Sequence, residues 1–409
     1  MYDFDSENNR RNTNSTKRDV KENELPMRIA DMDFKTCPAV INAIRKRVNI
    51  GSFGYSDIPD EYFEAYKKWF KKYHHVNYEV EDMVFSTGVV AAISSMVRKL
   101  TTVGEKVLVL SPVYNIFYNS IINNGRFVET SDLIYENYKY SIDFDNLEQK
   151  LKDPQVSLMI FCNPHNPVGK CFDKNELRKV ASLAKKYNVL VISDEVHCEI
   201  ITNGVEYIPF LSVSEEAREI GIACHSLSKC FNIAGLQNAC IVTKNKNLRH
   251  KIWRGINTDE VGEPNFFACD ATIAALNKGR KWLIELNDYI YSNKKYFVDR
   301  VNSELKNIHV ELTDATYLLW IDCTKIQKDS DVLVQELRNE TGLILSSGSV
   351  YGKNGNGFLR INLATTKKNV VDGTNRFIEY FKKYWLFFDC FCATASYKMA
   401  WEKSSNKNC

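Results

Sequence analysis

One lysine stands where its amine could act as a nucleophile. Lys229 lies in SLSKCFNIAGL (226–236), between two serines and directly after an apolar run that predicts a strand. A lysine amine whose pKa is lowered by burial can form a Schiff base with a carbonyl group and can act as a base. Taken alone, however, a lysine at the end of a strand is usually a solvated surface residue.

Polar residues also follow two other predicted strands. CNPHNPVG (162–169) is a proline-fixed loop that contains Asn166, and SDEVHCE (193–199) contains the adjacent carboxylates of Asp194 and Glu195. Such an acidic pair usually belongs to a solvated loop. Here the order is regular, because Asp194 follows Asn166 by 28 residues and Lys229 follows Asp194 by 35. The combination is more specific than any one of these residues.

Short apolar runs predict the strands that must position these side chains. The runs are continuously apolar rather than alternating, which indicates strands covered on both faces and a largely parallel α/β sheet. Such sheets bind ligands at the carboxyl ends of their strands. Helical spacing of apolar residues predicts helices in EYFEAYKKWFKKYHH, VAAISSMVRKL and ELRKVASLAKKY. The predicted strands are residues 106–110, 157–162, 189–193, 220–226 and 239–243.

The pattern changes after about residue 275, where a long polar helix precedes mixed strands and helices. We therefore expect a large α/β domain at 49–275 and a smaller α+β domain at 276–385. The N-terminal arm, residues 1–48, is expected to join the smaller domain in part. Residues 386–409 fit neither domain, and we interpret them as an atypical tail.

Composition restricts the class of protein. At 409 residues the chain exceeds the usual size of a single core, so two domains are expected. With 54 basic and 51 acidic residues, the net charge of +3 argues against a nucleic-acid or membrane-surface partner. Twelve cysteines without paired spacing indicate reduced thiols. The polar N-terminus and the absence of a long apolar run predict a cytoplasmic protein.

Together these motifs resemble the fold type I pyridoxal-phosphate enzymes, the aspartate aminotransferase superfamily, over residues 25–385. The resemblance narrows to the MalY/PatB-type cystathionine β-lyases and implies an α/β fold with pyridoxal 5′-phosphate as cofactor. The large domain would hold a mostly parallel seven-stranded sheet covered by helices. The segments that carry it are IADMDF (29–34), FGYSD (53–57), FSTGVVAAI (85–93), SPVYNIF (111–117), FNIAGLQ (231–237) and NGNGFLRINLAT (354–365).

The resemblance also implies roles at the reacting centre. Lys229 would carry the cofactor as a Schiff base and later take the substrate's α-proton. Asp194 would keep the pyridine nitrogen protonated, and Asn166 would donate to the phenolic oxygen. Tyr114 would stack on or beside the ring, although an ordinary core aromatic is the alternative. For His197, contact with the cofactor and a satisfied core histidine are both open.

Further residues would bind the phosphate and the substrate. The helix that opens at Gly88, with Val89 and Val90, offers backbone N–H groups and a positive dipole end. Hydroxyls of Ser226 and Ser228 would add donors to the phosphate.

Substrate binding is assigned in the same way. Arg360 would clamp the α-carboxylate bidentately, and Asn166 and Tyr55 would also contact substrate. Gly352, Gly355 and Gly357, which precede Arg360, indicate a site loop there. Tyr55 resembles a tyrosine that reaches the phosphate of the neighbouring subunit, which implies a homodimer with shared active sites.

The favoured activity is β-elimination from L-cystathionine or related cysteine S-conjugates, giving pyruvate, ammonia and a thiol. Aspartate-type aminotransferases carry an arginine eight residues after the lysine, where this chain has Gln237. Departures at Cys230, Lys170 and Phe172, where the family commonly has Thr, Arg and Trp, leave the substrate range open. The alternatives are a class I/II aminotransferase and a pyridoxal-phosphate protein that regulates transcription through a protein partner.

Overall fold

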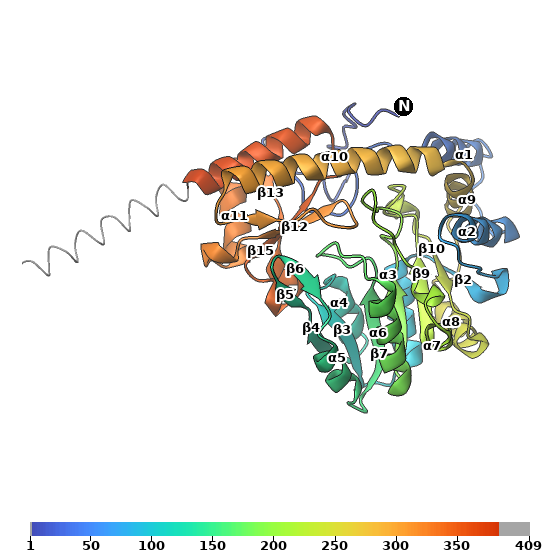
Figure 1. Ribbon diagram of the computed structural model, residues 1–409. Coiled ribbons are helices and arrows are strands. Elements are labelled where there is room, and N and C mark those ends of the chain that lie inside the picture. Colours follow the sequence, from blue (N-terminus) through green and yellow to red (C-terminus); the bar gives the residue numbers. More distant parts are fainter. Residues whose placement is uncertain (1, 384–409) are drawn as a thin grey trace, which may run out of the picture.

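The structure is a computed structural model that describes residues 2–383. Figure 1 shows a large sheet with helices on both sides and a smaller sheet beside it. The predicted tail at 386–409 lies outside the described residues. No helix in the described part of the chain is both long and apolar enough to cross a membrane.

The large sheet has seven strands, as expected, and β10 alone runs in the direction opposite to the other six. Five of the seven follow the apolar runs of the sequence, whereas β2 and β4 were not predicted. In spatial order the strands are β2 (Met83–Ser86), β10 (Ala239–Val242), β9 (Gly221–His225), β8 (Leu190–Asp194), β7 (Val156–Cys162), β3 (Lys106–Ser111) and β4 (Phe127–Asp132).

The strands are continuously apolar because both faces of the sheet are buried. Along β7, Leu158 and Ile160 join one hydrophobic cluster, whereas Met159 and Phe161 join the other. The first cluster lies under α3 (Val89–Leu100), α4 (Ile116–Ile122) and α8 (Lys246–Thr258). The second lies under α2 (Asp60–Tyr73), α5 (Phe144–Leu151), α6 (Lys174–Lys186), α7 (Glu215–Ile220) and α9 (Ala268–Lys278).

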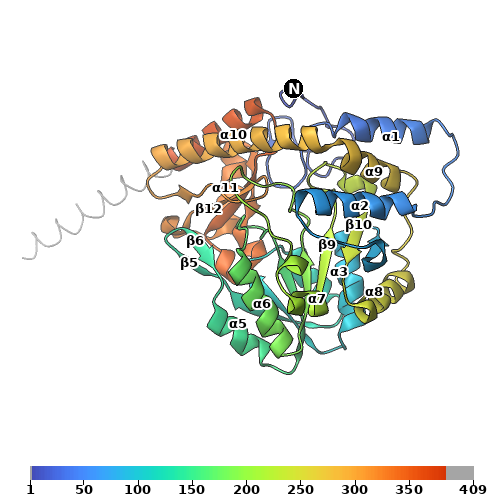
Figure 2. The ribbon, with the colours of Figure 1, turned by 45° about the vertical axis from the view of Figure 1, so that its right-hand side comes forward.

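A second, four-stranded antiparallel sheet has its own core. Its order is β11 (His309–Val310), β12 (Leu318–Asp322), β15 (Phe358–Asn362) and β14 (Ser346–Ser347). The long helix α10 (Arg280–Glu304) runs from α9 across to this sheet, as Figures 1 and 2 both show. α11 (Ser330–Thr341) and a helix at 367–383 pack on the same core.

The N-terminal arm contacts both parts of the molecule. β1 (Leu25–Pro26) pairs in parallel with β13 (Leu343–Ile344), and α1 (Pro38–Val48) packs on α9. A hairpin of β5 (Ile134–Glu136) and β6 (Lys139–Ser141) reaches from the large sheet to the small one, where the Tyr135 hydroxyl donates to Asp322 at 2.8 Å. The seam between the two sheets is therefore bridged by segments from distant parts of the sequence.

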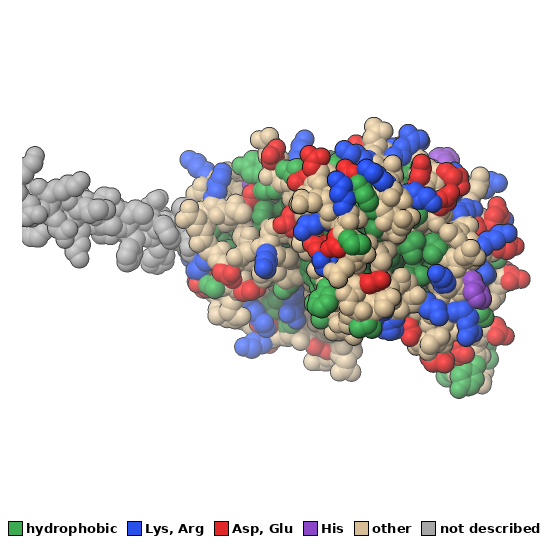
Figure 3. Space-filling model, turned by 90° about the horizontal axis from the view of Figure 1, so that it is seen from below, with side chains coloured by type: hydrophobic (Ala, Val, Ile, Leu, Met, Phe, Trp, Pro, Cys, Tyr) green, Lys and Arg blue, Asp and Glu red, His purple; other side chains and the backbone are tan. Residues whose placement is uncertain are grey.

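Charges are mixed over the surface. Figure 3 shows basic and acidic side chains interspersed on the face seen from below, without a broad area of one sign. The nine cysteines within residues 2–383 are free thiols, and eight of them are buried.

Candidate active site

Three strand ends place Asn166, Asp194 and Lys229 at one edge of the large sheet. β7, β8 and β9 are parallel neighbours, and their register puts Cys162 beside Asp194 and Asp194 beside Cys224. The loop after β7 carries Asn166, and the turn after β9 carries Lys229. Because parallel strands end at the same edge, residues more than sixty positions apart converge there.

Lys229 projects into the seam between the two sheets. Its Nζ donates to the carbonyl oxygen of Ala30 at 2.8 Å. Burial lowers the pKa of the amine, the positive charge of Arg360 lowers it further, and the carboxylates of Asp31 and Asp194 act in the opposite direction. A lowered pKa raises the fraction of neutral amine, which is the form that attacks a carbonyl or accepts a proton.

The two adjacent carboxylates after β8 have different surroundings. Asp194 is 4% exposed, and burial raises its pKa to about 6 against the opposing effects of the Val196 N–H and the Lys229 charge. Glu195 instead accepts from the Phe210 backbone N–H at 2.9 Å and braces that loop. Asp194 is therefore shielded from water, so a positive charge placed beside it would be attracted strongly to the carboxylate.

Arg360 reaches the same site from β15. Its Nη1 donates to Asn166 Oδ1 at 3.1 Å and its Nη2 to the Arg28 carbonyl at 3.0 Å. The guanidinium carbon lies 4.8 Å from the centre of the Tyr351 ring. Within residues 2–383 its buried Nε has no hydrogen-bond partner. The group keeps donor capacity for an incoming carboxylate.

Tyr114 and His197 complete the buried surroundings. Burial, helped by the Asp194 charge, raises the pKa of Tyr114 to about 12, so its hydroxyl stays protonated at neutral pH. Burial and the charges of Lys229 and Arg360 lower the pKa of His197 to about 3, so its imidazole is neutral. No described residue forms a hydrogen bond with His197 Nδ1, although this atom is buried.

The expected phosphate cradle opens at α3. Gly88 is the N-cap of this helix, with φ 151° and ψ 158°, a conformation that L side chains rarely adopt. A Cβ built there would lie 3.9 Å from Gln237 Oε1. Val89 is buried and Val90 is exposed at the start of the helix. Position 237 therefore lies beside the helix end where the phosphate is expected.

The two serines beside the lysine are used differently. Ser226 Oγ donates its single hydrogen to the Asn238 carbonyl at 2.7 Å and accepts from the Ser228 N–H at 3.2 Å. In this structure Ser226 therefore ties the lysine turn to the start of β10, and its hydroxyl hydrogen is not free for a phosphate. Ser228 is only partly buried.

Tyr55 lies away from this site in its own chain. Its side chain is fully exposed, with a relative exposure of 101%, in the segment 51–59 before α2. It therefore makes no contact with the buried side chains around Lys229.

Sequence reasoning missed three further components. The Ala30 carbonyl accepts from Lys229 and also from the Tyr317 hydroxyl at 2.9 Å. Tyr351 supplies the ring face under Arg360. Tyr317 directly precedes β12 and Tyr351 precedes the glycine-rich turn, but neither position carries a signal that distinguishes it from a core aromatic.

These residues fit pyridoxal phosphate. The site offers an amine for the aldehyde, a buried carboxylate for the ring nitrogen, and an unpartnered imidazole nitrogen beside them. In addition, α3 opens at Gly88 without a side-chain cap, so its first backbone N–H groups could bind an anion. No group of three or more His, Cys, Asp or Glu among the described residues is arranged to hold a metal ion.

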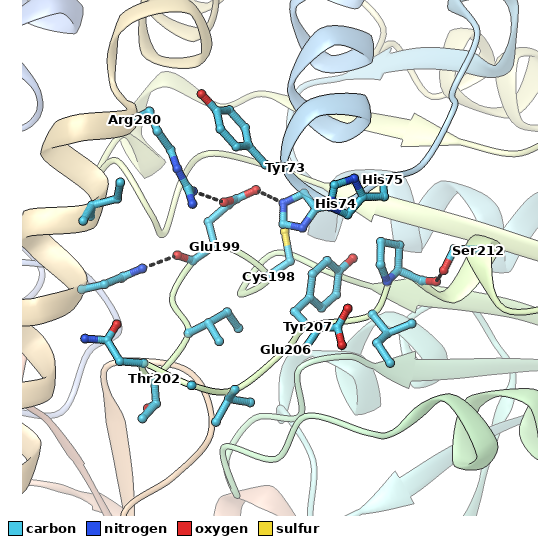
Figure 4. A pocket seen from close by; sticks show the side chains of 18 of the residues that line it. Tyr73, His74, His75, Cys198, Glu199, Thr202, Glu206, Tyr207, Ser212 and Arg280 are labelled. Carbon is cyan, nitrogen blue, oxygen red and sulfur yellow. Dashed lines mark hydrogen bonds and ion pairs between the residues drawn. The ribbon is translucent and has the colours of Figure 1, made fainter.

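A cavity of about 700 Å³ lies at a different place (Figure 4). Its wall includes Glu199, which accepts from Trp69 Nε1 at 2.5 Å and from His74 Nε2 at 2.6 Å. In Figure 4 Arg280 also points at this carboxylate, 3.6 Å away. Lys229, Asp194 and Arg360 do not line it. We assign the chemistry to the strand ends because reactive groups converge there, whereas Glu199 is already paired within the protein.

Comparison with known proteins gives consistent results. The family model of aminotransferase class I and II matches residues 22–377. The chain is 36% identical to cystathionine β-lyase PatB of Bacillus subtilis, over 86% of this chain and 91% of that protein. It is 31% identical to protein MalY of Escherichia coli, over 85% and 89%. The PLP-bound C-S lyase from Staphylococcus hominis has a TM-score of 0.86 at 33% identity, with 92% of this chain and 98% of that chain covered.

Proposed function

The chain belongs to the aminotransferase class I and II family, and on this premise we propose that it is a pyridoxal-phosphate-dependent carbon–sulfur β-lyase. Its substrate would be L-cystathionine or a related cysteine S-conjugate, and its products pyruvate, ammonia and a thiol. The observation that carries the choice of lyase is Gln237 beside Gly88, where aspartate-type aminotransferases place an arginine. The similarity to PatB, a cystathionine β-lyase, supports the same choice.

The side chains divide the work between cofactor and substrate. Pyridoxal phosphate, when bound, supplies an aldehyde that links to amines and a ring that accepts electrons from the substrate's α-carbon. Lys229 would hold the cofactor and then accept the α-proton, a task that its lowered pKa favours. Asp194 would hold positive charge on the ring nitrogen. The ring of Tyr114 would pack beside the cofactor.

Substrate orientation would depend on Arg360 and Asn166. Their contact at 3.1 Å places a planar guanidinium next to an amide, so that a carboxylate could accept from both. The α-amino group would then lie towards Lys229. His197, neutral and without a hydrogen-bond partner on Nδ1 in the described chain, would contribute a hydrogen bond rather than charge.

We further propose a cytoplasmic homodimer with shared active sites. The fully exposed Tyr55, with the exposed Phe53 in the same segment, supports contact with a second copy. The free, mostly buried thiols support a reducing compartment.

The test is product analysis with the purified holoenzyme. Incubation with L-cystathionine should release pyruvate and a free thiol in equal amounts, and Lys229→Ala protein prepared in the same way should release neither. Transfer of the amino group to an added keto acid, without pyruvate, would contradict the lyase and favour an aminotransferase.

A further inference from the structure

A short segment of the N-terminal arm, residues 28–34, lies between the two principal groups of the proposed site. The carbonyl of Arg28 accepts from Arg360 Nη2 at 3.0 Å. The carbonyl of Ala30 accepts from Lys229 Nζ at 2.8 Å and from the Tyr317 hydroxyl at 2.9 Å. Lys229 lies in the turn after β9 of the large sheet, and Arg360 lies in β15 of the small sheet. This segment therefore connects the two sheets at the site.

Asn362 fixes the segment from the side of the small sheet. It lies two residues after Arg360 on β15 and therefore projects from the same face of the strand. Its Nδ2 donates to the carbonyls of Ile29 at 2.6 Å and Asp31 at 2.7 Å, and its Oδ1 accepts from the Ala364 N–H at 2.8 Å. The side chain is 1% exposed, so water does not compete for these bonds.

Asn232 fixes the same segment from the side of the large sheet. It lies three residues after Lys229, in a left-handed conformation with φ 54° that asparagine tolerates. Its Nδ2 donates to the carbonyls of Met32 and Phe34, both at 3.0 Å, and its Oδ1 accepts from the Met32 N–H at 3.0 Å. One amide side chain thus brackets three backbone groups.

Ion pairs hold the segment from its other side. Lys17, 1% exposed, donates to the Asp31 carbonyl at 3.0 Å and lies 3.3 Å from an Asp33 carboxylate oxygen. Arg10 forms ion pairs at 2.9 Å with the carboxylates of both Asp31 and Asp33, and Arg18 also pairs with Asp33. Because the arm itself is fixed, the segment provides a rigid reference for whatever is bonded to it.

We propose that Asn232 and Asn362 are positioning residues, which set the Lys229 amine and the Arg360 guanidinium in register by bonding to one shared segment, 28–34. Neither asparagine is assigned a contact with substrate or cofactor. The inference rests on the proposed function for its kinetic consequences. The same hydrogen bonds connect three segments that stood out in the sequence, IADMDF, FNIAGLQ and FLRINL, because the side-chain amides of the last two bond to the backbone of the first.

The test compares two variants with a matched control. Asn362→Ala removes the two donations that Asn362 makes to the segment. Asn232→Gly removes the side-chain bonds of Asn232 while keeping a residue that tolerates positive φ. The control is Asn302→Ala, since Asn302 brackets a backbone in the same way, donating to the Val310 carbonyl at 2.8 Å and accepting from its N–H at 3.0 Å, at the far edge strand of the small sheet.

The two variants should separate the kinetic constants of the holoenzyme. Asn362→Ala should raise KM for the thioether about 10-fold with little change in kcat, because the carboxylate clamp is displaced. Asn232→Gly should lower kcat about 10-fold and shift the pH midpoint of the cofactor's visible band, because the lysine is displaced. Both should speed amide hydrogen exchange across residues 28–34, and Asn302→Ala should change neither exchange there nor the kinetic constants.

The proposal is overturned if exchange across 28–34 is unchanged in either variant, or if both variants alter KM and kcat in the same proportion. Should the wild-type holoenzyme release no pyruvate, the lyase assignment fails. Hydrogen exchange and the titration of the visible band would still decide the role of the two asparagines.

Discussion

At the scale of single residues, burial and a low pKa do not distinguish the site lysine. Lys294 is 1% exposed, and burial lowers its pKa to about 7. Its Nζ donates to the Thr313 carbonyl at 2.8 Å. The charge of Asp314 acts on Lys294, whereas those of Asp194 and Arg360 both act on Lys229. The assignment of Lys229 therefore depends on its neighbours.

The two lysines provide a direct test of cofactor attachment. Lys229→Ala protein should lose the visible band of the bound cofactor, and borohydride should fix no cofactor to it. Lys294→Met protein should keep the band, because a buried amine alone does not bind pyridoxal phosphate. Peptide mass spectrometry after borohydride treatment locates the label. A labelled Lys294, or a band that survives in Lys229→Ala, would contradict the assignment.

Asp194 predicts a stability that depends on pH. Burial raises its folded-state pKa from 3.8 to about 6, so the folded protein binds this proton more tightly than the unfolded chain. The contribution of Asp194 to stability therefore falls as pH rises from about 4 to 6 and stays low above that. In cofactor-free protein at pH 7.5, Asp194→Asn should raise the free energy of unfolding by up to about 3 kcal/mol.

Urea unfolding of both cofactor-free proteins measures this difference, which should shrink to well under about 1 kcal/mol near pH 4, because Asp194 is then protonated in the folded protein and only partly ionised in the unfolded chain. The same substitution should weaken cofactor binding, since the ring nitrogen loses its counter-charge. An Asp194→Asn variant that is less stable than the wild type at pH 7.5, or equally stabilised at both pH values, would show that burial does not raise the pKa of Asp194.

At this scale the sequence predicts side chains that carry their own chemistry. Asn166, Asp194, Lys229 and Arg360 are found because residue type and motif agree, and the structure brings them together. The Ala30 carbonyl could not be predicted, because a backbone acceptor about 200 residues from Lys229 has no residue-type signal. The hydrogen bond from Ser226 to the Asn238 carbonyl could not be predicted either, since a hydroxyl donates to whichever acceptor the fold supplies.

At the scale of elements, the sequence predicts buried strands better than edges. The five apolar runs are confirmed as β3, β7, β8, β9 and β10. β4 has the sequence FVETSD and lies at one edge, and β2, at the other edge, has only four residues. An edge strand needs less apolar surface, so it has a weaker pattern. The direction of β10 is set by the segments that connect it to its neighbours, so it cannot be predicted from the residues of the strand itself.

The start of α3 gives a prediction for an element. Gly88→Ala forces a side chain into a conformation with φ 151°. Strain there costs about 1–3 kcal/mol. A local backbone change at the start of α3 that relieves this strain should raise the dissociation constant of pyridoxal phosphate about 10-fold or more. Titration of cofactor-free protein measures this constant. Gly235→Ala is the control, because it has no positive φ and a Cβ there would meet only open space. Equal affinity in both variants would argue against the cradle.

At the scale of the whole molecule, one segment before α2 leaves apolar and aromatic side chains exposed. The segment 49–57 exposes Ile50 at 58%, Phe53 at 59% and Tyr55 completely. Exposed apolar and aromatic residues grouped on one segment favour contact with another protein surface.

Mixed dimers would decide whether sites are shared. We expect Tyr55→Phe protomers mixed with Lys229→Ala protomers to regain activity, because one site of each hybrid would combine an intact Lys229 with the partner subunit's Tyr55. Random exchange makes half of the dimers hybrid with one good site each, so the gain should approach about a quarter of wild-type activity.

The control mixes Lys229→Ala with Arg360→Ala protomers. Both residues meet within one chain, since each bonds to segment 28–34 of that chain, so every site in that mixture keeps a defect and the mixture should stay inactive. Exchange must first be verified with differently tagged subunits. Activity that does not rise in the Tyr55 mixture would mean that each chain has a complete site, and Tyr55 would then have no part in it.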